Sequence, residues 1–556
     1  MVLFFHLVFF VTLAAASTTT LWTVQLAEGT NAAAYAAEHG FHYAGKISFL
    51  DGNWHKFTDI NNGGNKRAVR DVRSLPHVLQ ANEEVERFQY KRIADPLYEA
   101  QWHLHGHSFA VDADMGPANV TGAGIRIAVV DDGLEHEHPD LKANYDPINS
   151  WDFNDGDNDP TPTLRVDGHG TAAAGVASAV KENGHCGRGV APGAKLVGLR
   201  LIARAVSDLT EATALTHNAI GAIDIYSCSW GPVDDGISMV EPGPLVQAAL
   251  QQYAGQMRGR LGKGTIYVWA AGNGRDNGDS CAFDGYASSP FVNAIGALDH
   301  TGHQSWYSEG CSALMAVTPS SGSMQGITTV DLMGSAGYDP GECNANFGGT
   351  SAAAPLAAGI IALMLQERPD LTWRDVKHVI AKGSVPVDTS HPGWTMNGGG
   401  YRHSYQYGFG LMKVPSILLA AQQHKLVPSP MKAYYSQLVT FDSRVGSIPF
   451  TFNHTVRESG IRFIEHVILY VGISHEMRGH ITLKLISPHG TESVLATERP
   501  TDVTFNYPAS GWKFNSVRFW GEHVTDGVWQ IIVDDTHPET RNRGHFNGYE
   551  LIVYGY

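Results

Sequence analysis

The pattern of hydrophobic and polar residues changes along the chain and divides it into regions. Between residues 122 and about 419, short apolar runs typical of buried strands alternate with segments of helical periodicity. The clearest of these runs are residues 125–130, 195–201 and 265–270. Because strands that alternate with helices build parallel sheets, this region is predicted to be an α/β domain.

After Val427-Pro-Ser-Pro430 the pattern becomes a series of strands with alternating apolar and polar positions. These strands are residues 466–471, 480–486, 528–533 and 550–554. Alternation with a period of two is typical of half-buried strands. The C-terminal part is therefore predicted to be an all-β domain.

The first residues form an apolar run that ends in Ala14-Ala15-Ala16, the small-residue pattern that signal peptidase accepts. A buried strand or a membrane anchor is the alternative, and the run begins without Lys or Arg. It is nevertheless short for a membrane span. We therefore expect residues 1–16 to be a signal peptide. The best later apolar stretch, residues 355–365, covers only about half a span, so no transmembrane anchor is expected.

Composition narrows the class of protein. A chain of 556 residues is too long for one core and predicts two or three domains. A hydrophobic content of 43% with 17% charged residues is typical of a compact globular protein. The formal net charge of −16 argues against nucleic-acid binding and favours a basic partner or bound cations, with simple solubility as the alternative.

Five cysteines are an odd number, so at least one thiol is expected to be free in an oxidising compartment. Cys228 lies in the apolar segment 226–230, which predicts a buried, unpaired thiol, and no nearby histidine supports a catalytic role. The other four can form two bridges whose pairing the residues alone leave open: Cys186, Cys281, Cys311 and Cys343.

Three short segments of the α/β region carry candidate catalytic side chains. Asp131 ends the apolar strand 127–130, at the edge where a parallel sheet presents polar groups. His169 precedes an Ala-rich helix predicted over 172–180, and Ser351 stands where a glycine-rich turn enters an apolar helix. Taken singly, each has a structural alternative: a strand-ending turn, a structural histidine or an N-cap serine.

Together, the three segments give Asp, His and Ser in the chain order of the subtilisin triad. Ser351 is expected to attack the scissile carbonyl, His169 to take and return the proton, and Asp131 to hold the imidazole tautomer. Asn273 lies where another strand runs into a glycine turn and can donate its amide to the oxyanion of the tetrahedral intermediate. The sequence therefore predicts a serine protease.

Longer motifs in this order resemble those of the proprotein convertases, the kexin and furin branch of the subtilisin family. In the α/β region they are IAVVDDGLEHEHPDL, DGHGTAAAGV, YSCSWGPVDDG, WAAGNG and GGTSAAAPLAAGIIAL. In the C-terminal region, HITLKLISPHGTESVL, GVWQIIVDD and NGYELIVYGY resemble the β-barrel P domain of convertases. That pairing distinguishes convertases from degradative subtilisins.

The resemblance implies a multidomain chain. Its expected parts are a signal peptide (1–16), a small α+β inhibitory prodomain (17–92), a subtilisin-like α/β catalytic domain (93–425) and a jelly-roll-like, all-β P domain (426–556). The implied enzyme is a monomeric serine endopeptidase of the Golgi or secretory granules, or secreted in soluble form. It cleaves precursor proteins after Lys-Arg or Arg-Arg, and its own autocleavage is expected after Lys91-Arg92, with the prodomain as inhibitor.

The resemblance also assigns substrate pockets, where S1 and S2 hold the substrate residues P1 and P2 that precede the cut bond. Asp234 and Asp284 match S1, which suits a P1 Arg because a guanidinium needs carboxylate partners. The other implied contacts are Asp132 at S2, Glu211 near S4, and Ser229, Trp230 and Gly231 along the substrate backbone. Val166 and Val240 stand where relatives carry acids, and Gln89 stands at P4 of the chain's own processing site. P1 Arg is thus expected to dominate recognition.

Calcium is the implied cofactor, because clusters of hard oxygen donors suit it. The first expected set is Asp95, Asp140 and Asn183 with the carbonyls of Val180, His185 and Gly187. The second is Asp152, Asp157 and Asp159, and the third is Asp234, Asp279 and Glu309 beneath S1. An Asp-rich run like the second set also suits a solvated turn.

By the same resemblance, Cys186 is expected to pair with Cys343 and Cys281 with Cys311. Glycosylation sequons begin at Asn119 and Asn453. Two other classes of protein are alternatives. A catalytically silent calcium-binding scaffold predicts a broken triad, and a broad degradative subtilase predicts an apolar S1 pocket without a P domain. Both fit the sequence less well.

Overall fold

The computed structural model describes residues 21–59, 72–84, 95–117, 119–445, 449–523, 526–537 and 544–556. The chain forms two compact units, Met1–Arg92 and Ile93–Tyr556. The expected signal peptide and the pair Lys91-Arg92 lie outside the described residues.

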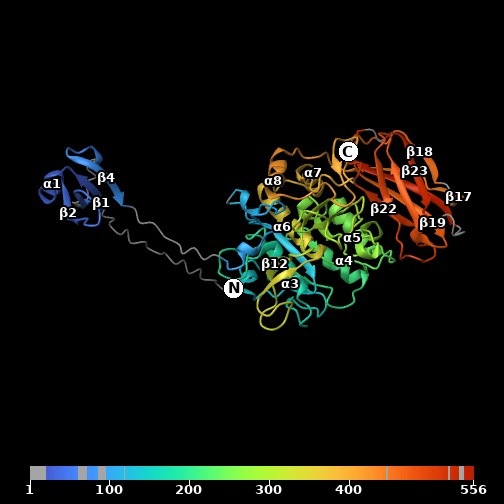
Figure 1. The fold of residues 1–556 in the computed structure, drawn as a ribbon, viewed down its shortest axis with the longest axis horizontal. Coiled ribbons are helices and arrows are strands. Elements are labelled where there is room, and N and C mark those ends of the chain that lie inside the picture. Colours follow the sequence, from blue (N-terminus) through green and yellow to red (C-terminus); the bar gives the residue numbers. More distant parts are fainter. Residues whose placement is uncertain are drawn as a thin grey trace, which may run out of the picture. The chain divides into compact units, whose positions relative to one another are not determined.

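The first unit is a four-stranded antiparallel sheet with one helix (Figure 1). Its elements are β1 (Leu21–Leu26), α1 (Ala32–His39), β2 (Phe41–Lys46), β3 (Trp54–Asp59) and β4 (Val78–Glu84), and the strand order is β2-β3-β1-β4. Every second residue of β1 is buried, as expected for a strand with one face on a core. Asn31 caps α1 by accepting a hydrogen bond from the N–H of Ala34, and Gly40 ends the helix in the left-handed region.

A seven-stranded sheet forms the centre of the α/β region, which we define as residues 95–427. In sheet order its strands are β11 (Ala316–Pro319), β10 (Val292–Leu298), β9 (Ile266–Ala270), β8 (Ile225–Cys228), β5 (Arg126–Asp131), β7 (Lys195–Arg200) and β6 (Trp151–Asp152). All neighbouring pairs are parallel. Every residue of β8, β9 and β10 is buried, because a parallel sheet has both faces covered. The predicted α/β region is confirmed.

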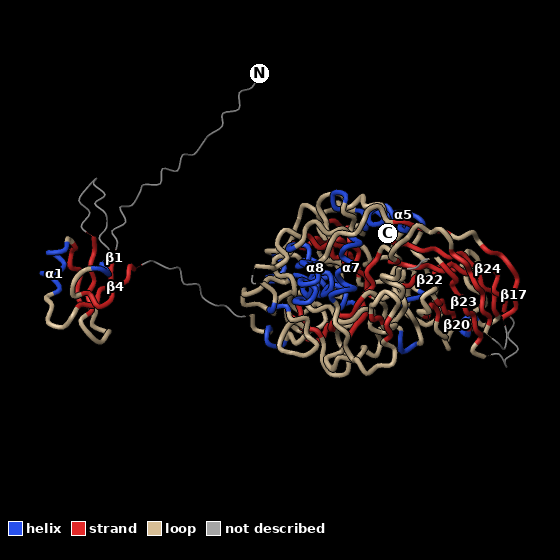
Figure 2. The backbone as a smooth tube through the Cα atoms, turned by 90° about the horizontal axis from the view of Figure 1, so that it is seen from above, coloured by secondary structure: helices blue, strands red, loops and turns tan. Residues whose placement is uncertain are grey.

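Helices pack around this sheet (Figure 2). They are α2 (Pro139–Lys142), α3 (His169–Ser178), α4 (Asp208–Thr216), α5 (Pro244–Leu250), α6 (Thr350–Glu367), α7 (Trp373–Gly383) and α8 (Val414–Gln423). Two small hairpins add β12 (Ile327–Val330) with β13 (Cys343–Phe347), and β14 (Thr395–Met396) with β15 (Arg402–His403). Within the described residues, α6 is the one helix long and apolar enough to cross a membrane, but 89% of it is buried against the sheet and its neighbours. It is a core helix of the α/β region.

The C-terminal β region, residues 432–556, consists of two antiparallel sheets. One contains β16 (Lys432–Tyr435), β24 (Gly544–Gly555), β19 (Ile464–His475) and β22 (Trp512–Ser516), with β17 (Val439–Val445) also paired to β24. The other contains β18 (Phe450–Val456), β23 (Gly527–Asp535), β20 (Ile481–Ile486) and β21 (Glu492–Ala496). The predicted all-β C-terminal region is confirmed.

The two regions of the second unit share buried contacts. One hydrophobic cluster contains Phe283 of the α/β region together with Phe514 of the β region. Trp512 donates its indole N–H to the carbonyl of Ala282 at 2.9 Å. A buried ion pair adds to these contacts, since Arg374 of α7 lies 2.7 Å from Glu465 of β19. The β region therefore packs as part of one body with the α/β region.

The cysteines of the second unit pair as the family resemblance implied. One bridge joins Cys186 to Cys343 and the other joins Cys281 to Cys311. Cys228 is free and buried, and burial raises the pKa of its thiol well above the usual value. A thiol that stays protonated is a poor nucleophile, which agrees with a structural role.

We predict that the Arg374–Glu465 pair contributes strongly to stability. Glu465→Gln leaves the buried Arg374 without its counter-charge and should lower the free energy of unfolding by about 3–5 kcal/mol. Glu492→Gln is the control, because Glu492 pairs with Lys484 at the surface and its loss should cost less than about 1 kcal/mol. Urea unfolding followed by tryptophan fluorescence measures both, and equal midpoints for the two variants would contradict the prediction.

Candidate active site

The candidate catalytic residues lie at the ends of three elements. Asp131 is the last residue of β5, His169 is the first of α3, and Ser351 is the second of α6. Nδ1 of His169 lies 2.8 Å from Oδ1 of Asp131, within hydrogen-bond distance. Because a carboxylate only accepts, Nδ1 must carry the proton and Nε2 is left as the basic nitrogen.

Glycine at position 170 makes this contact possible. A Cβ at Gly170 would lie 2.3 Å from the carbonyl oxygen of Gly133 and 2.7 Å from the Cβ of Asp131. Any side chain there would push the start of α3 away from β5. Gly170 thus fixes the distance between His169 and Asp131.

Ser351 lies in the first turn of α6, whose first residue, Thr350, follows two glycines. Gly349 has φ 73°, a conformation that favours glycine and turns the chain into the helix. The Ser351 hydroxyl donates to the carbonyl of Ser229 over a long 3.4 Å. It must rotate toward His169 before it can give up its proton, as is common in free proteases.

Asn273 follows β9 and is held by the residue before the serine. Its Oδ1 accepts hydrogen bonds from the N–H and the hydroxyl of Thr350, at 2.8 and 3.1 Å. This fixes the carbonyl end of the amide, so that the Nδ2 group is available to donate to a substrate oxyanion. Sequence reasoning misses Thr350, whose one sequence signal is its place beside Ser351.

Charges around His169 favour its protonated form. Burial lowers the pKa of His169, but the charge and hydrogen bond of Asp131, with a further contribution from Asp132, raise it to about 9. Asp131 itself is fully buried, and its Oδ2 has no hydrogen-bond partner among the described residues. The pair therefore stabilises the imidazolium that forms when the serine loses its proton.

Two acidic side chains expected at S1 lie on neighbouring segments. Asp234 accepts a hydrogen bond from the backbone N–H of Asn273 at 2.7 Å, and Asp284 accepts one from Tyr286 at 2.7 Å. Burial raises the pKa of Asp284 to about 7, and the nearby charges of Asp234 and Asp279 add to the rise. Two backbone hydrogen bonds to the carboxylate oppose this rise. A Cβ at Gly231 would lie 3.0 Å from Oδ2 of Asp284, so glycine leaves that carboxylate room for a ligand.

Asp132, expected to face P2, has a structural task as well. Its Oδ1 accepts from the N–H of Gly170 at 2.8 Å and its Oδ2 from the N–H of His169 at 3.2 Å. It is only 8% exposed, and burial followed by the charge of Asp131 raises its pKa to about 7. Asp132 therefore caps α3 and holds the backbone of His169, a contact that the sequence did not indicate.

The remaining residues expected near the substrate are either buried or uncharged. Glu211 lies in the first turn of α4, is 7% exposed and adjoins Tyr286. The indole N–H of Trp230 donates to the carbonyl of Val130 at 2.8 Å. Val166 and Val240 are exposed apolar side chains, so neither adds an acid near the substrate.

Among the described residues, no group of three or more His, Cys, Asp or Glu side chains converges as a metal site. Two of the expected calcium sets nevertheless show features that suit a cation. In the first set, Asn183 donates its side-chain amide to Oδ1 of Asp140 at 2.7 Å, while the buried Oδ2 of Asp140 has no partner there. Burial, and the charge of Asp95 after it, raise the pKa of Asp140 to about 6.

The third set also suits a positive charge. Burial and the charges of Asp279 and Asp234 raise the pKa of Glu309 well above its usual value. The second set does not fit in this arrangement, because Asp152 already pairs with the buried guanidinium of Arg200 at 2.7 Å. Its other members, Asp157 and Asp159, are exposed.

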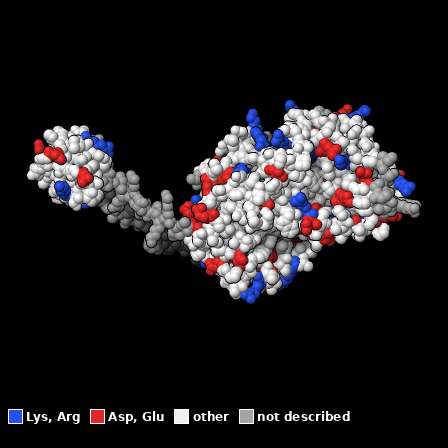
Figure 3. Space-filling view, viewed as in Figure 1, with Lys and Arg blue, Asp and Glu red and all other residues white. Residues whose placement is uncertain are grey.

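Both sequon asparagines, Asn119 and Asn453, are exposed at the surface. On the face shown in Figure 3, Lys and Arg side chains are scattered among acidic ones.

Family models match both regions of the second unit. The Subtilase family model matches residues 122–410, and the Proprotein convertase P-domain model matches residues 464–553. A serine protease of Aeromonas sobria has the same fold, with a TM-score of 0.74 over 83% of this chain and 96% of that chain, at 24% identity.

Curated relatives share more of the sequence. Proprotein convertase subtilisin/kexin type 7 of Mus musculus is 37% identical over 95% of this chain and 71% of its own length. Kexin of Saccharomyces cerevisiae is 40% identical over 83% of this chain and 56% of its own length. Endoprotease bli-4 of Caenorhabditis elegans is 39% identical over 89% of this chain, which spans about half of that protein, 52%.

An Asp–His–Ser site at the edge of a parallel sheet, joined to two antiparallel sheets, defines a subtilase with a P domain. Within that class, the chain belongs to the subtilisin/kexin proprotein convertases. The expected family and fold class are confirmed. The C-terminal β region is named the P domain from here on.

We predict that Asp131 sets the pKa of His169. A fluorophosphonate probe labels Ser351 only while His169 is neutral, so the labelling rate should rise with pH through a midpoint near pH 9. In Asp131→Asn, the lowering by burial remains and only the smaller contribution of Asp132 opposes it, so the midpoint should fall well below 9, with labelling slower by about 10⁴-fold. Identical midpoints in the two proteins would contradict this account.

Proposed function

We propose that the chain is a calcium-dependent serine endopeptidase of the secretory pathway that cleaves precursor proteins after paired basic residues. The observation that carries the proposal is a pair of half-buried acids, Asp234 and Asp284, near enough for the charge of Asp234 to raise the pKa of Asp284, with Asp234 bound to the backbone N–H of Asn273. The names of kexin and of the subtilisin/kexin convertases among the relatives support it.

The proposed reaction is peptide hydrolysis through an acyl-enzyme. Ser351 Oγ attacks the scissile carbonyl while His169 Nε2 takes its proton, and Asp131 stabilises the resulting imidazolium. The oxyanion receives a hydrogen bond from Nδ2 of Asn273. His169 then returns the proton to the leaving amine, and water repeats the sequence to release the acid.

The proposed specificity follows from the burial and the charge of the acids at S1. Asp284 lies desolvated near Asp234 and Asp279, so its ionised form is disfavoured until a positive group arrives. A P1 guanidinium supplies that charge and can bind carboxylates through paired hydrogen bonds. Asp132, whose pKa is raised to about 7 in the same way, would attract a basic P2 side chain.

Calcium would stabilise the buried acids rather than take part in bond breaking. We assign one ion to the first set, where a buried oxygen of Asp140 has no partner among the described residues, and one to the third set, where burial and the charges of Asp279 and Asp234 raise the pKa of Glu309. Bound cations would neutralise these charges and hold the loops that carry them.

Maturation is the other part of the proposal. Residues 1–16 would direct the chain to the secretory pathway, and residues 17–92 would act as an inhibitory prodomain released by cleavage after Lys91-Arg92. The described residues of this segment form a compact unit separate from the described residues that follow, which supports a domain boundary between Glu84 and Asp95.

We predict cleavage of peptides ending in Lys-Arg and Ala-Arg, and no cleavage of a matched Ala-Leu peptide. Ser351→Ala should abolish the activity, and a calcium chelator should remove it until calcium is restored. Asp284→Asn should lower kcat/KM for P1 Arg by about 30- to 4,000-fold, the effect of about 2–5 kcal/mol from one buried charge.

The control for Asp284→Asn is Asp276→Asn, which removes an exposed carboxylate from a nearby loop and should change kcat/KM little. Equal cleavage of the Lys-Arg and Ala-Leu peptides would disprove the specificity. Full activity in the presence of chelator would disprove the calcium dependence.

A further inference from the structure

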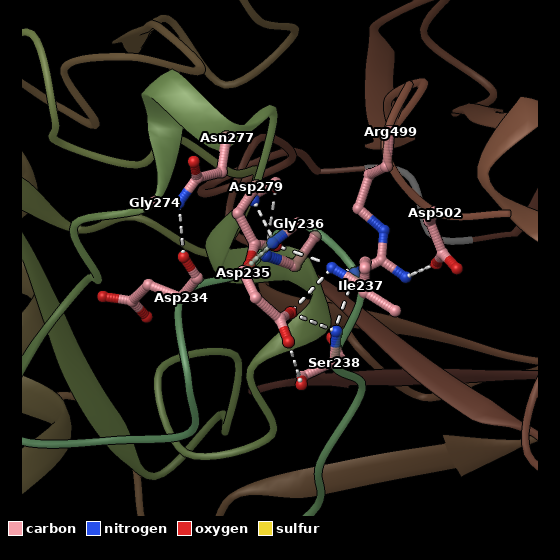
Figure 4. Close-up of polar contacts among 12 residues, drawn as sticks. Asp234, Asp235, Gly236, Ile237, Ser238, Gly274, Asn277, Asp279, Arg499 and Asp502 are labelled. Atoms are coloured by element: carbon pink, nitrogen blue, oxygen red, sulfur yellow. Dashed lines mark hydrogen bonds and ion pairs between the residues drawn. The ribbon is translucent and has the colours of Figure 1, made fainter. Parts of the chain in front are cut away.

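An arginine of the P domain lies against the segments that form S1 (Figure 4). Arg499 is 1% exposed, and its Nη1 donates to the carbonyl of Ser238 at 2.9 Å. Its guanidinium also lies over the ring of Phe283, 3.9 Å from the centroid. Ser238 follows Asp234 by four residues, and Phe283 directly precedes Asp284. One side chain therefore touches both segments that carry the S1 acids.

Neighbouring P-domain residues reinforce this contact. Asp502 pairs with Arg499, and also with Arg478 at 2.8 Å. Arg478 donates in turn to the carbonyl of Ile237, and the hydroxyl of Thr501 donates to the carbonyl of Asn277 at 3.0 Å. The segment 234–238 thus receives hydrogen bonds from Arg478 and Arg499 of the P domain, and Asp502 holds these two guanidinium groups in place.

The segment 234–238 leads directly to the candidate oxyanion donor, Asn273. Ser238 and Ile237 are bound by the side chain of Asp235, whose Oδ1 accepts their N–H groups at 2.6 and 2.8 Å. The residue before Asp235, Asp234, accepts a hydrogen bond from the N–H of Asn273 at 2.7 Å. Movement of the loop would therefore change both the acid of S1 and the donor to the oxyanion.

Arg499 also makes an electrostatic contact with an acid of the α/β region. Its Nη1 is 3.6 Å from Oδ1 of Asp279. The cation therefore ties the P domain to a third segment next to the S1 residues.

We propose that Arg499 is a positioning residue for S1, through which the P domain sets the preference of the active site for P1 Arg. The idea rests on the proposed function and adds that specificity depends on a residue outside the catalytic domain. Arg499 acts through the 234–238 and 283–284 segments and does not touch the substrate.

The test compares full-length secreted wild type with Arg499→Gln, Arg499→Lys and Glu465→Gln, each quantified by active-site titration. Glu465→Gln also breaks a buried ion pair between the two domains, but away from S1. Matched peptides ending in Lys-Arg and Lys-Lys give kcat and KM for the two P1 residues.

Arg499→Gln should raise KM for the P1 Arg peptide and lower the Arg/Lys ratio of kcat/KM by about 10- to 100-fold, the effect of losing a buried charged hydrogen bond. Arg499→Lys should recover part of the Arg/Lys ratio of kcat/KM, because lysine keeps the positive charge but lacks the several N–H donors of the guanidinium. Glu465→Gln should reduce the amount of active enzyme while leaving the ratio unchanged.

An unchanged ratio in Arg499→Gln, or an equal fall in Glu465→Gln, would overturn the proposal. If Arg499→Gln yields no active enzyme, Thr501→Val serves in its place. It removes only the hydroxyl that binds the carbonyls of Gly236 and Asn277 and should lower the ratio by about threefold. An unchanged ratio there would also overturn the proposal. Failure of the wild type to prefer P1 Arg would instead refute the proposed function.

Discussion

The active site depends on one buried carboxylate held against a helix N-terminus. Asp131 lies in the sheet core, where an isolated charge is costly, and the hydrogen bond from His169 compensates it. That bond requires α3 to approach β5 so closely that position 170 must be glycine. The same approach lets Asp132 cap α3. The close packing of α3 against β5 therefore determines both the local fold and the basicity of His169.

A second constraint is the excess of half-buried and buried acids near the site. Burial raises the pKa values of Asp234, Asp279, Asp284 and Glu309, and the charges of Asp234 and Asp279 add to the rise at Asp284 and Glu309. Such a pocket needs positive charge from elsewhere. A substrate guanidinium, a calcium ion and Arg499 of the P domain can each supply it, which gives the P domain a direct connection to substrate recognition.

The sequence predicted the fold where local pattern decides it. The strands 195–201 and 265–270 appear as β7 and β9 within one residue at either end, because buried parallel strands are apolar throughout. The helix predicted over 172–180 begins earlier, at His169, because Asp132 caps it from a distant strand. The strand predicted over 466–471 is half of β19, Ile464–His475, whose pairing with β24 shifts register at Gly472 and interrupts the alternation.

For the site, motifs placed Asp131, His169, Ser351 and Asn273, because each motif encodes a local turn at the end of an element. Contacts between distant segments could not be predicted in the same way. Arg499 meets Ser238 across 261 positions, and Arg374 meets Glu465 across 91. Nothing in the local pattern of these residues indicates a partner, because long charged side chains are common at surfaces. Only the packed structure shows that they are buried.

The central claim is that Ser351 is a nucleophile served by an acid-lined S1 pocket, and a covalent inhibitor tests it most directly. Peptidyl phosphonates ending in Lys-Arg or Ala-Leu are incubated with the secreted protein, and the modified residue is located by peptide mass spectrometry. The account predicts an adduct on Ser351 with the Lys-Arg probe, little with Ala-Leu, and none with either in Ser351→Ala. Equal labelling by the two probes, or an adduct on another residue, would contradict it.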